Sequence, residues 1–573
     1  MISILKKLPL PFLILILAGC GGGNSSQISN PTITLVAPVS TVIAAGTTLQ
    51  FSAIVAGSGN TTVLWFVNNI PGGNSTVGTI SPQGLYTAPN VPTQNGSVLI
   101  SASPQVYPVI STSFTISITF ANVSLRGNYV FSINGTQAGS PWVTVGSFTA
   151  NGDGTVSNGT EDINEPSGIS SAIPFSGSYL IDANGQGTAT FTSTQGSVTM
   201  SFTLNNQGQA VATRTDTGSV ATGTFYPQLT TALTLTSLNA PYVFSFTGTS
   251  SSGKLLNAVG TFVTDGSTAL TNAEEDLNDG GTTANQPFTG SYSISGNGRG
   301  TATFTDSTGT RTYDFYIVSP TQLQFIETDT LGNLSGTVFQ QQSVTSTTML
   351  TGGYVFYAAG NNGTATYGIA GGFATDTTIS GNINAGTDDI NEAGGITTNA
   401  TVTGSFTSDA FGRGTITLSG SSGTTNYVYY FISPSAAFLL TTDTNINASG
   451  ELFFQSGGYS TATLAGNYTL TLTSPVGSTT PSSAVGLLSL NGNGALAGFE
   501  NTNDNGTSTG QLSVTGTYAV TALTTNTSTR GIATLITSGG ASTNFAFYPI
   551  SNSSVILLGE GGSPVIGALV YQY

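Results

Sequence analysis

The chain has 573 residues and few charges: 25 acidic residues stand against 9 basic ones, and charged residues make up only 6% of the total. This net charge of −16 argues against nucleic acid and anionic lipid as partners, because both bind through Lys and Arg. Disorder is excluded, since hydrophobic residues reach 38% and alternate with polar ones. Histidine is absent, which removes the Ser-His-Asp and Cys-His nucleophile systems and the commonest zinc ligand.

The first twenty residues have the layout of an export signal. Lys6 and Lys7 precede an apolar stretch at 8–17, which is too short to span a bilayer as a permanent helix. The stretch ends in LAGC at 17–20, and Cys20 is the only cysteine in the chain.

LAGC resembles the lipobox of bacterial lipoproteins. The resemblance implies cleavage before Cys20, lipidation of Cys20 and attachment to a membrane through that anchor. Gly21 follows the cysteine, as in lipoproteins that are sorted to the outer membrane, so the resemblance implies a place on the bacterial outer membrane or cell surface. The alternative is an ordinary secretory signal in which the cysteine occurs by chance.

Residues 20–30 have the composition of a flexible tether, and the first folded unit is predicted at 31–120. Its short alternating runs have the spacing of a β-sandwich. QFSAIV at 50–55, VLWFVN at 63–68 and GLYTAP at 84–89 resemble the bacterial Ig-like domains of surface proteins. That resemblance implies a spacer or adhesive role and supplies no catalytic residues.

The rest of the chain repeats one pattern four times, at a spacing of 112 to 114 residues. A period of this length exceeds a solenoid repeat and matches a whole small domain. The markers are Tyr129, Tyr242, Tyr354 and Tyr468, then GSY, GSY, GSF and GTY, then GQGTATF, GRGTATF, GRGTITL and RGIATL. The predicted units are 121–228, 238–341, 350–456 and 464–573, joined by linkers of under ten residues.

Each repeat contains about eight short alternating runs separated by turns rich in Gly, Asn, Asp and Ser. Helical periodicity is missing, so short connections require an antiparallel meander, which closure into a barrel would free of exposed edges. The predicted fold class is therefore all-β: an N-terminal Ig-like sandwich followed by four tandem antiparallel meander barrels, with two-sheet sandwiches as the alternative. The repeats also resemble uncharacterised tandem β-repeats of exported bacterial lipoproteins. Five units in line would project on the order of 150 Å.

An acidic motif recurs in the repeats as EDINE (161–165), EDLND (275–279) and DDINE (388–392), and the fourth copy reads ENTND (500–504). Its oxygen-bearing side chains suggest a Ca²⁺ site, because calcium prefers carboxylate and amide oxygens. The candidate ligands are Asp162, Asn164, Asp276, Asn278, Asp389 and Asn391. The alternative is that these residues bond nearby backbone N–H groups. Paired-carboxylate glycosidase chemistry is a third interpretation, which adjacent residues on one strand do not favour.

Trp142, in GSPWVTVG of the first repeat, is the candidate for contact with a ligand or partner, as a partly exposed aromatic at a strand entry. Two functional hypotheses remain. The first is a non-catalytic, lipid-anchored surface protein that acts as spacer, adhesin or envelope-interaction module, with a glycan or protein as its partner. The second is a binding protein that takes a carbohydrate or small hydrophobic ligand through its barrels. Inward residues distinguish them, because a barrel filled with apolar side chains leaves no room for a ligand.

Overall fold

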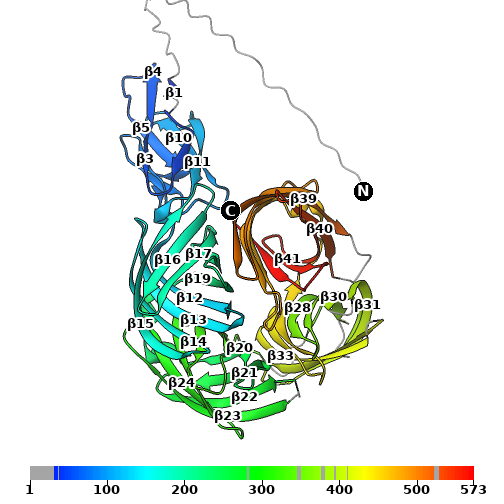
Figure 1. Ribbon diagram of the computed structural model, residues 1–573. Helices are drawn as coiled ribbons and strands as arrows, with labels where there is room; N and C mark the ends of the chain where they lie inside the picture. Colours follow the sequence, from blue (N-terminus) through cyan, green and yellow to red (C-terminus); the bar gives the residue numbers. More distant parts are fainter. Residues whose placement is uncertain are drawn as a thin grey trace, which may run out of the picture.

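The chain is all-β, with an N-terminal sheet region followed by four closed barrels (Figure 1). The computed structural model describes residues 31–572 except 37, 281–282, 345–349, 376–380, 393–394, 410, 422 and 522–527. Short 3₁₀ helices lie before three of the barrels: η1 (Asn122–Ser124), η2 (Thr230–Ala232), η3 (Leu235–Ser237) and η4 (Thr461–Thr463).

The N-terminal region contains three sheets around one core. The sheets pair β1 with β4, order β2-β11-β10-β5-β6, and order β3-β9-β8-β7. Phe51, Trp65 and Tyr86 are buried at the centre of this core. The strands are β1 (Thr32–Val36), β2 (Val42–Ala44), β3 (Thr48–Gln50), β4 (Ser52–Ala56), β5 (Val63–Val67), β6 (Ile70–Pro71), β7 (Gly73–Asn74), β8 (Gly78–Ile80), β9 (Leu85–Thr87), β10 (Ser97–Pro104) and β11 (Thr112–Thr119).

Each later repeat forms one barrel of eight antiparallel strands in chain order. Barrel 1 has β12 (Arg126–Gln137), β13 (Ser140–Asn151), β14 (Thr155–Glu165), β15 (Gly168–Ile181), β16 (Gln186–Ser193), β17 (Gly196–Leu204), β18 (Ala210–Arg214) and β19 (Ser219–Pro227). Barrel 2 has β20 (Pro241–Thr249), β21 (Leu255–Thr264), β22 (Ala269–Asn278), β23 (Thr283–Ile294), β24 (Arg299–Thr305), β25 (Thr310–Ser319), β26 (Gln322–Glu327) and β27 (Ser335–Gln340).

Barrels 3 and 4 repeat the plan. Barrel 3 has β28 (Gly353–Asn361), β29 (Thr366–Thr375), β30 (Asn382–Glu392), β31 (Gly395–Ser408), β32 (Arg413–Gly420), β33 (Gly423–Ser433), β34 (Ala436–Thr441) and β35 (Asn447–Gln455). Barrel 4 has β36 (Gly466–Thr473), β37 (Ser482–Leu490), β38 (Ala495–Asp504), β39 (Thr507–Thr521), β40 (Arg530–Thr537), β41 (Ser542–Ser551), β42 (Ser554–Gly559) and β43 (Ile566–Tyr571).

First and last strands pair in every barrel, which confirms the predicted closed meander over the sandwich alternative. In barrel 1, for example, Phe131 of β12 lies opposite Phe225 of β19. Closure pairs the backbone groups that an edge strand would leave exposed.

The barrel interiors are filled by apolar and aromatic side chains. Spaces of about 10 Å³ in barrel 2 and 20 Å³ in barrel 4 remain between these side chains, roughly the volume of one water each. The paired glycines of GQGTATF, GRGTATF and GRGTITL, called the GxG motif here, allow this packing. A Cβ at Gly300 would lie 2.2 Å from the Phe315 ring, and one at Gly187 would lie 2.3 Å from Phe202, so the aromatic rings rest directly on the glycine backbone.

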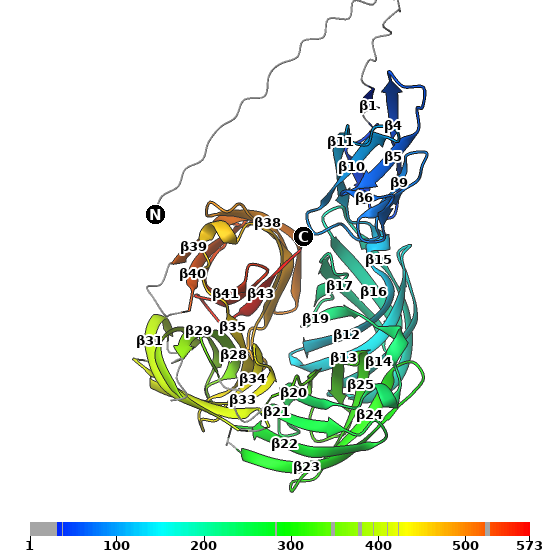
Figure 2. The same cartoon turned by 180° about the vertical axis from the view of Figure 1, so that it is seen from behind.

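The four barrels form a ring, visible from both sides in Figures 1 and 2. Barrel 4, in orange and red, returns to barrel 1, and Asn206 N–H donates to Gln572 O across this junction at 2.9 Å. The in-line arrangement expected from the short linkers is therefore wrong. Side contacts hold each barrel against the next, and contacts between barrel 4 and barrel 1 close the circle.

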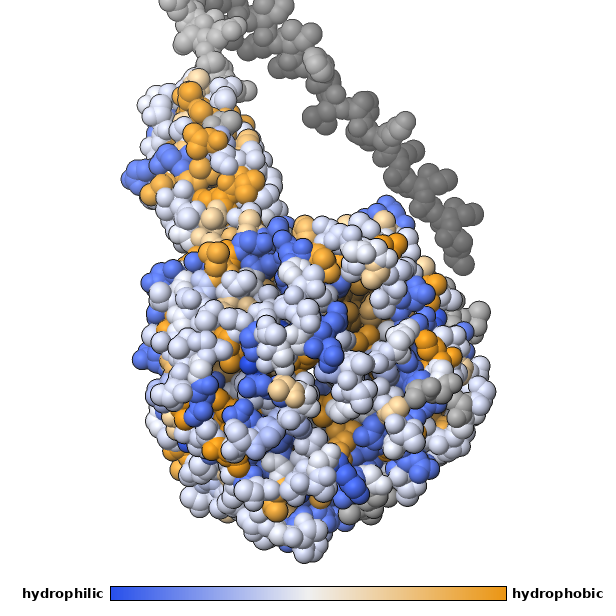
Figure 3. Space-filling model, viewed as in Figure 1, coloured by the Kyte–Doolittle hydropathy of each residue, from blue (hydrophilic) through white to orange (hydrophobic). Residues whose placement is uncertain are grey.

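The surface carries few charges. Weakly polar residues cover most of the face seen in Figure 3, and strongly polar ones are scattered among them. No helix in the described part of the chain has the length and apolar character needed to cross a membrane.

Candidate functional site

The acidic motif of barrel 1 lies in its junction with barrel 2, called seam 1–2 here. Arg299 of β24 donates to both carboxylate oxygens of Asp162, from Nε and Nη2, at 2.8 Å each. The hydroxyl of Tyr316 donates to Asp162 Oδ2 at 2.7 Å. Asn164 Nδ2 donates to the carbonyl of Glu327 at 2.8 Å. A bidentate Arg–carboxylate pair fixes orientation as well as distance, so the motif sets how one barrel sits on the next.

Seam 2–3 repeats this arrangement. Arg413 donates to both oxygens of Asp276, at 2.8 and 2.9 Å, and the Tyr430 hydroxyl donates to Asp276 Oδ2 at 2.7 Å. Asn278 Nδ2 donates to the carbonyl of Thr441 at 2.8 Å. The same four residue types therefore hold two successive junctions.

Seam 3–4 has the third copy. Arg530 donates to both oxygens of Asp389, at 2.7 and 2.6 Å, and Tyr548 also donates to Asp389. Arg530 makes a second ion pair, with Glu560, at 3.0 Å. Asn391 Nδ2 donates to the carbonyl of Gly559 at 2.7 Å.

The three aspartates are at most 1% exposed. Burial and the nearby Asp162 carboxylate raise the pKa of the Tyr316 hydroxyl well above its usual value. Tyr316 therefore stays protonated and serves as a hydrogen-bond donor to Asp162. In the same seam, burial raises the pKa of Asp314 to about 6, with the charge of Asp162 as a second cause.

The structure thus places the six proposed calcium ligands in three seams, two in each. Both oxygens of Asp162, Asp276 and Asp389 accept from a guanidinium, whose positive charge disfavours a cation beside it. No cluster of three or more His, Cys, Asp or Glu that could hold a metal occurs among the described residues. Backbone bonding, the alternative interpretation, is present too: Asp162 Oδ1 accepts from the N–H of Ala172 at 2.7 Å. Neither interpretation anticipated that the main partner lies in the neighbouring barrel.

The residue before each aspartate points the other way, toward the barrel interior with Ile163 and its counterparts, as alternation predicts. Burial raises the pKa of Glu275 to about 7, and the nearby Asp306 charge adds to this. The equivalent Asp388 and Glu500 also have pKa values raised to about 7, again with burial as the main cause. These carboxyl groups are buried in the barrels.

The prediction that Trp142 is partly exposed is wrong. Its side chain is 3% exposed and belongs to the core of barrel 1, and the Arg214 guanidinium lies over its ring at 4.1 Å from the centroid. The loop-entry interpretation failed because Trp142 already lies in β13, two residues after its start, and faces inward. Cys20, the predicted lipidation site, lies outside the described residues.

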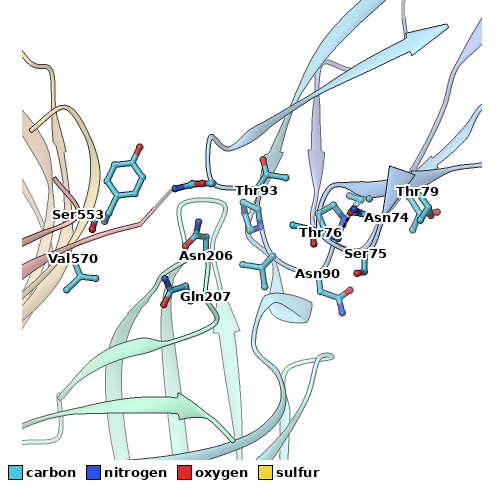
Figure 4. A pocket seen from close by; sticks show the side chains of 18 of the residues that line it. Asn74, Ser75, Thr76, Thr79, Asn90, Thr93, Asn206, Gln207, Ser553 and Val570 are labelled. Atoms are coloured by element: carbon cyan, nitrogen blue, oxygen red, sulfur yellow. Dashed lines mark hydrogen bonds between the residues drawn. The ribbon is translucent and has the colours of Figure 1, made fainter. Parts of the chain in front are cut away.

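A cleft of about 870 Å³ lies where the N-terminal region meets the ring (Figure 4). The N-terminal region contributes Asn90 and Thr93, barrel 1 contributes Asn206 and Gln207, and barrel 4 contributes Ser553. Figure 4 shows these side chains around one space between three parts of the chain. The described lining contains amide, hydroxyl and small apolar side chains and no charged residue.

Neither a protein-family model nor a curated protein matches this chain.

Proposed function

We propose that the chain is a non-catalytic, lipid-anchored surface protein of a bacterium that acts as an adhesive or envelope-interaction module. The lipobox-like LAGC at 17–20 and the tether at 20–30 support the anchor. The N-terminal region, proposed to be Ig-like, would then stand between the membrane and the ring. The ring makes the protein a compact platform rather than a long spacer.

The buried carboxylates carry the non-catalytic part of the proposal. Asp162, Asp276 and Asp389 are each engaged by an arginine and a tyrosine of the next barrel. General acid–base chemistry needs a carboxyl group within reach of a substrate. Groups that are sealed in seams serve assembly instead.

The second candidate function, ligand binding inside the barrels, finds less support. The spaces left within barrels 2 and 4 hold about one water each, far below the 300 Å³ or more that small-molecule sites need. The observation that favours a binding role is instead the cleft between the N-terminal region and the ring.

The anchor and the surface location can be tested in cells that express the full chain. We expect an alkyne-bearing palmitate analogue to label the wild type, and protease added to intact cells to cleave it. Cys20→Ser should lose the label. Label that persists in this variant, or a wild-type protein that resists external protease while a known surface protein is cleaved, would contradict the proposal.

A further inference from the structure

The ring has one junction unlike the other three: the contact between barrel 4 and barrel 1, called the closing seam here. Asn503 donates to the carbonyls of Arg214 and Ser219, at 2.7 and 2.5 Å, as its counterparts do elsewhere. The charged partners are missing, however. Asn501 stands where the other barrels have Asp, and Gln186 stands where the other barrels have Arg.

The tyrosine of the other seams is replaced as well. Thr203 lies opposite Gln186 in the barrel 1 ladder, as Tyr316 lies opposite Arg299 in barrel 2. The Thr203 hydroxyl and Gln186 Nε2 are buried without a hydrogen-bond partner, whereas Gln186 Oε1 accepts from Gln511 Nε2 of barrel 4 across the seam. Unpaired buried polar groups weaken an interface, because they have lost water and gained nothing in return.

The apolar contact across the junction is also lost. Val130 and Ile326 belong to the buried apolar cluster that joins barrels 1 and 2, and seams 2–3 and 3–4 have clusters of the same kind. In the closing seam the corresponding positions are Thr469 and Thr213. Among the described residues, no apolar cluster and no ion pair joins barrel 4 to barrel 1.

No linker joins these two barrels, since they are the first and last of the four. With no linker, no ion pair and no joining apolar cluster among the described residues, this seam should separate at a lower free energy than the other three. Hydrogen bonds that cross it, such as Gly218 N–H to Gly506 O at 2.9 Å, are broken when it opens.

The cleft described above lies directly over this seam. Asn206 lines the cleft from barrel 1 and bonds through its N–H to Gln572 O of barrel 4. Tyr571, which precedes Gln572, lines the cleft from the other side, and its partly exposed ring packs against Tyr468 at 5.3 Å between centroids. A ligand in the cleft would therefore touch both barrels and the N-terminal region at once.

We propose that this cleft binds a neutral saccharide and that the bound saccharide holds the closing seam shut. This inference rests on the proposed function, since it names the ligand of the adhesive surface. The uncharged lining offers no counter-charge to an ionic ligand, and its amide and hydroxyl groups suit a ligand rich in hydroxyls. The volume is within the range of small-ligand sites. On the ring side of the cleft, barrels 1 and 4 are closed and offer no free strand edge on which a peptide could add as a further strand.

Binding is tested with the full chain and a panel of neutral gluco-, galacto- and manno-oligosaccharides, with sialylated and sulfated ones for comparison. We expect binding from the neutral group only. Asn90→Ala with Gln207→Ala removes two exposed amides whose side chains make no described hydrogen bond, and should weaken binding about tenfold or more. Gln105→Ala, at an exposed position of the N-terminal region outside the cleft, is the matched control and should bind like wild type.

Coupling to the seam is read from hydrogen exchange at Asn206 and Gly218, whose N–H groups cross it. We expect saccharide to slow exchange at both by about tenfold and to leave Gln342, which donates across seam 2–3, unchanged. Thr213→Cys with Ser483→Cys, at hydroxyls 2.6 Å apart, should slow exchange without saccharide once oxidised.

Several outcomes would overturn the inference: no binding by any neutral member, equal binding by the cleft variant, or binding without slower exchange at Asn206 and Gly218. A panel that binds nothing while Cys20-dependent surface display persists refutes the saccharide site alone. Loss of surface display refutes the proposed function, whatever the panel shows.

Discussion

Replacing Arg299 by Met tests the claim that the charged seams hold the ring together. The substitution removes both guanidinium hydrogen bonds to Asp162, which is 0% exposed, and leaves a buried carboxylate with only the Tyr316 hydroxyl and one backbone N–H. Removing one partner of a buried pair typically costs about 3–5 kcal/mol. We therefore expect the free energy of unfolding of barrel 1, when it is packed against barrel 2, to fall by that amount.

The assay is a urea titration followed by Trp142 fluorescence in a Trp65→Phe background, because Trp142 lies in the core of barrel 1. Arg126→Met is the control, since Arg126 is exposed and makes no ion pair among those described; it should change the free energy of unfolding by less than about 0.5 kcal/mol. The double variant Asp162→Asn with Arg299→Gln copies the chemistry of the closing seam and should lose less than Arg299→Met alone. A loss below about 1 kcal/mol for Arg299→Met would refute the reasoning.

Three further predictions concern the barrel interiors. Glu275→Gln should stabilise the protein at pH 8 by up to about 3 kcal/mol and have little effect at pH 4.5, as measured by denaturant titration at both values. Burial raises the native pKa of Glu275 from the ordinary 4.5 to about 7. Between these two pH values the native protein binds more protons than the unfolded chain, so its stability falls as the pH rises through that window. A loss of stability at pH 8 would contradict this. Gly300→Ala should destabilise barrel 2 by about 1–3 kcal/mol, seen as a lower melting temperature, because its Cβ would lie 2.2 Å from the Phe315 ring; an unchanged melting temperature would show that the ring moves freely. Trp142→Ala should cost about 3–5 kcal/mol in barrel 1 and leave ligand binding unchanged in an oligosaccharide assay, whereas loss of binding without loss of stability would restore the contact role.

The barrels were predictable because their strands alternate and their turns recur. Trp142 also carried the signal for its position: it has the same parity along β13 as Phe148, so alternation alone indicates an inward side chain. The prediction relied on the Gly-Ser-Pro before it and misjudged where the strand begins. Val143 and Val145 obscured the pattern, because they face outward into a seam and make the strand apolar on both faces.

The ring was not predicted, although the sequence contains its trace. The motif aspartate occurs in copies 1 to 3, as in Asp162, and the GxG arginine occurs in copies 2 to 4, as in Arg299. That offset of one copy is the signature of contact between consecutive units. The closure of barrel 4 on barrel 1 depends on the accumulated angle of three seams, which no local pattern encodes.

Small-angle X-ray scattering of residues 31–573 tests the ring most directly. A compact ring of about 540 residues should have a radius of gyration of about 24 to 28 Å. Five units in line, on the order of 150 Å long, would give about 43 Å. A value near the lower range supports the closed ring, and one above about 40 Å would contradict it.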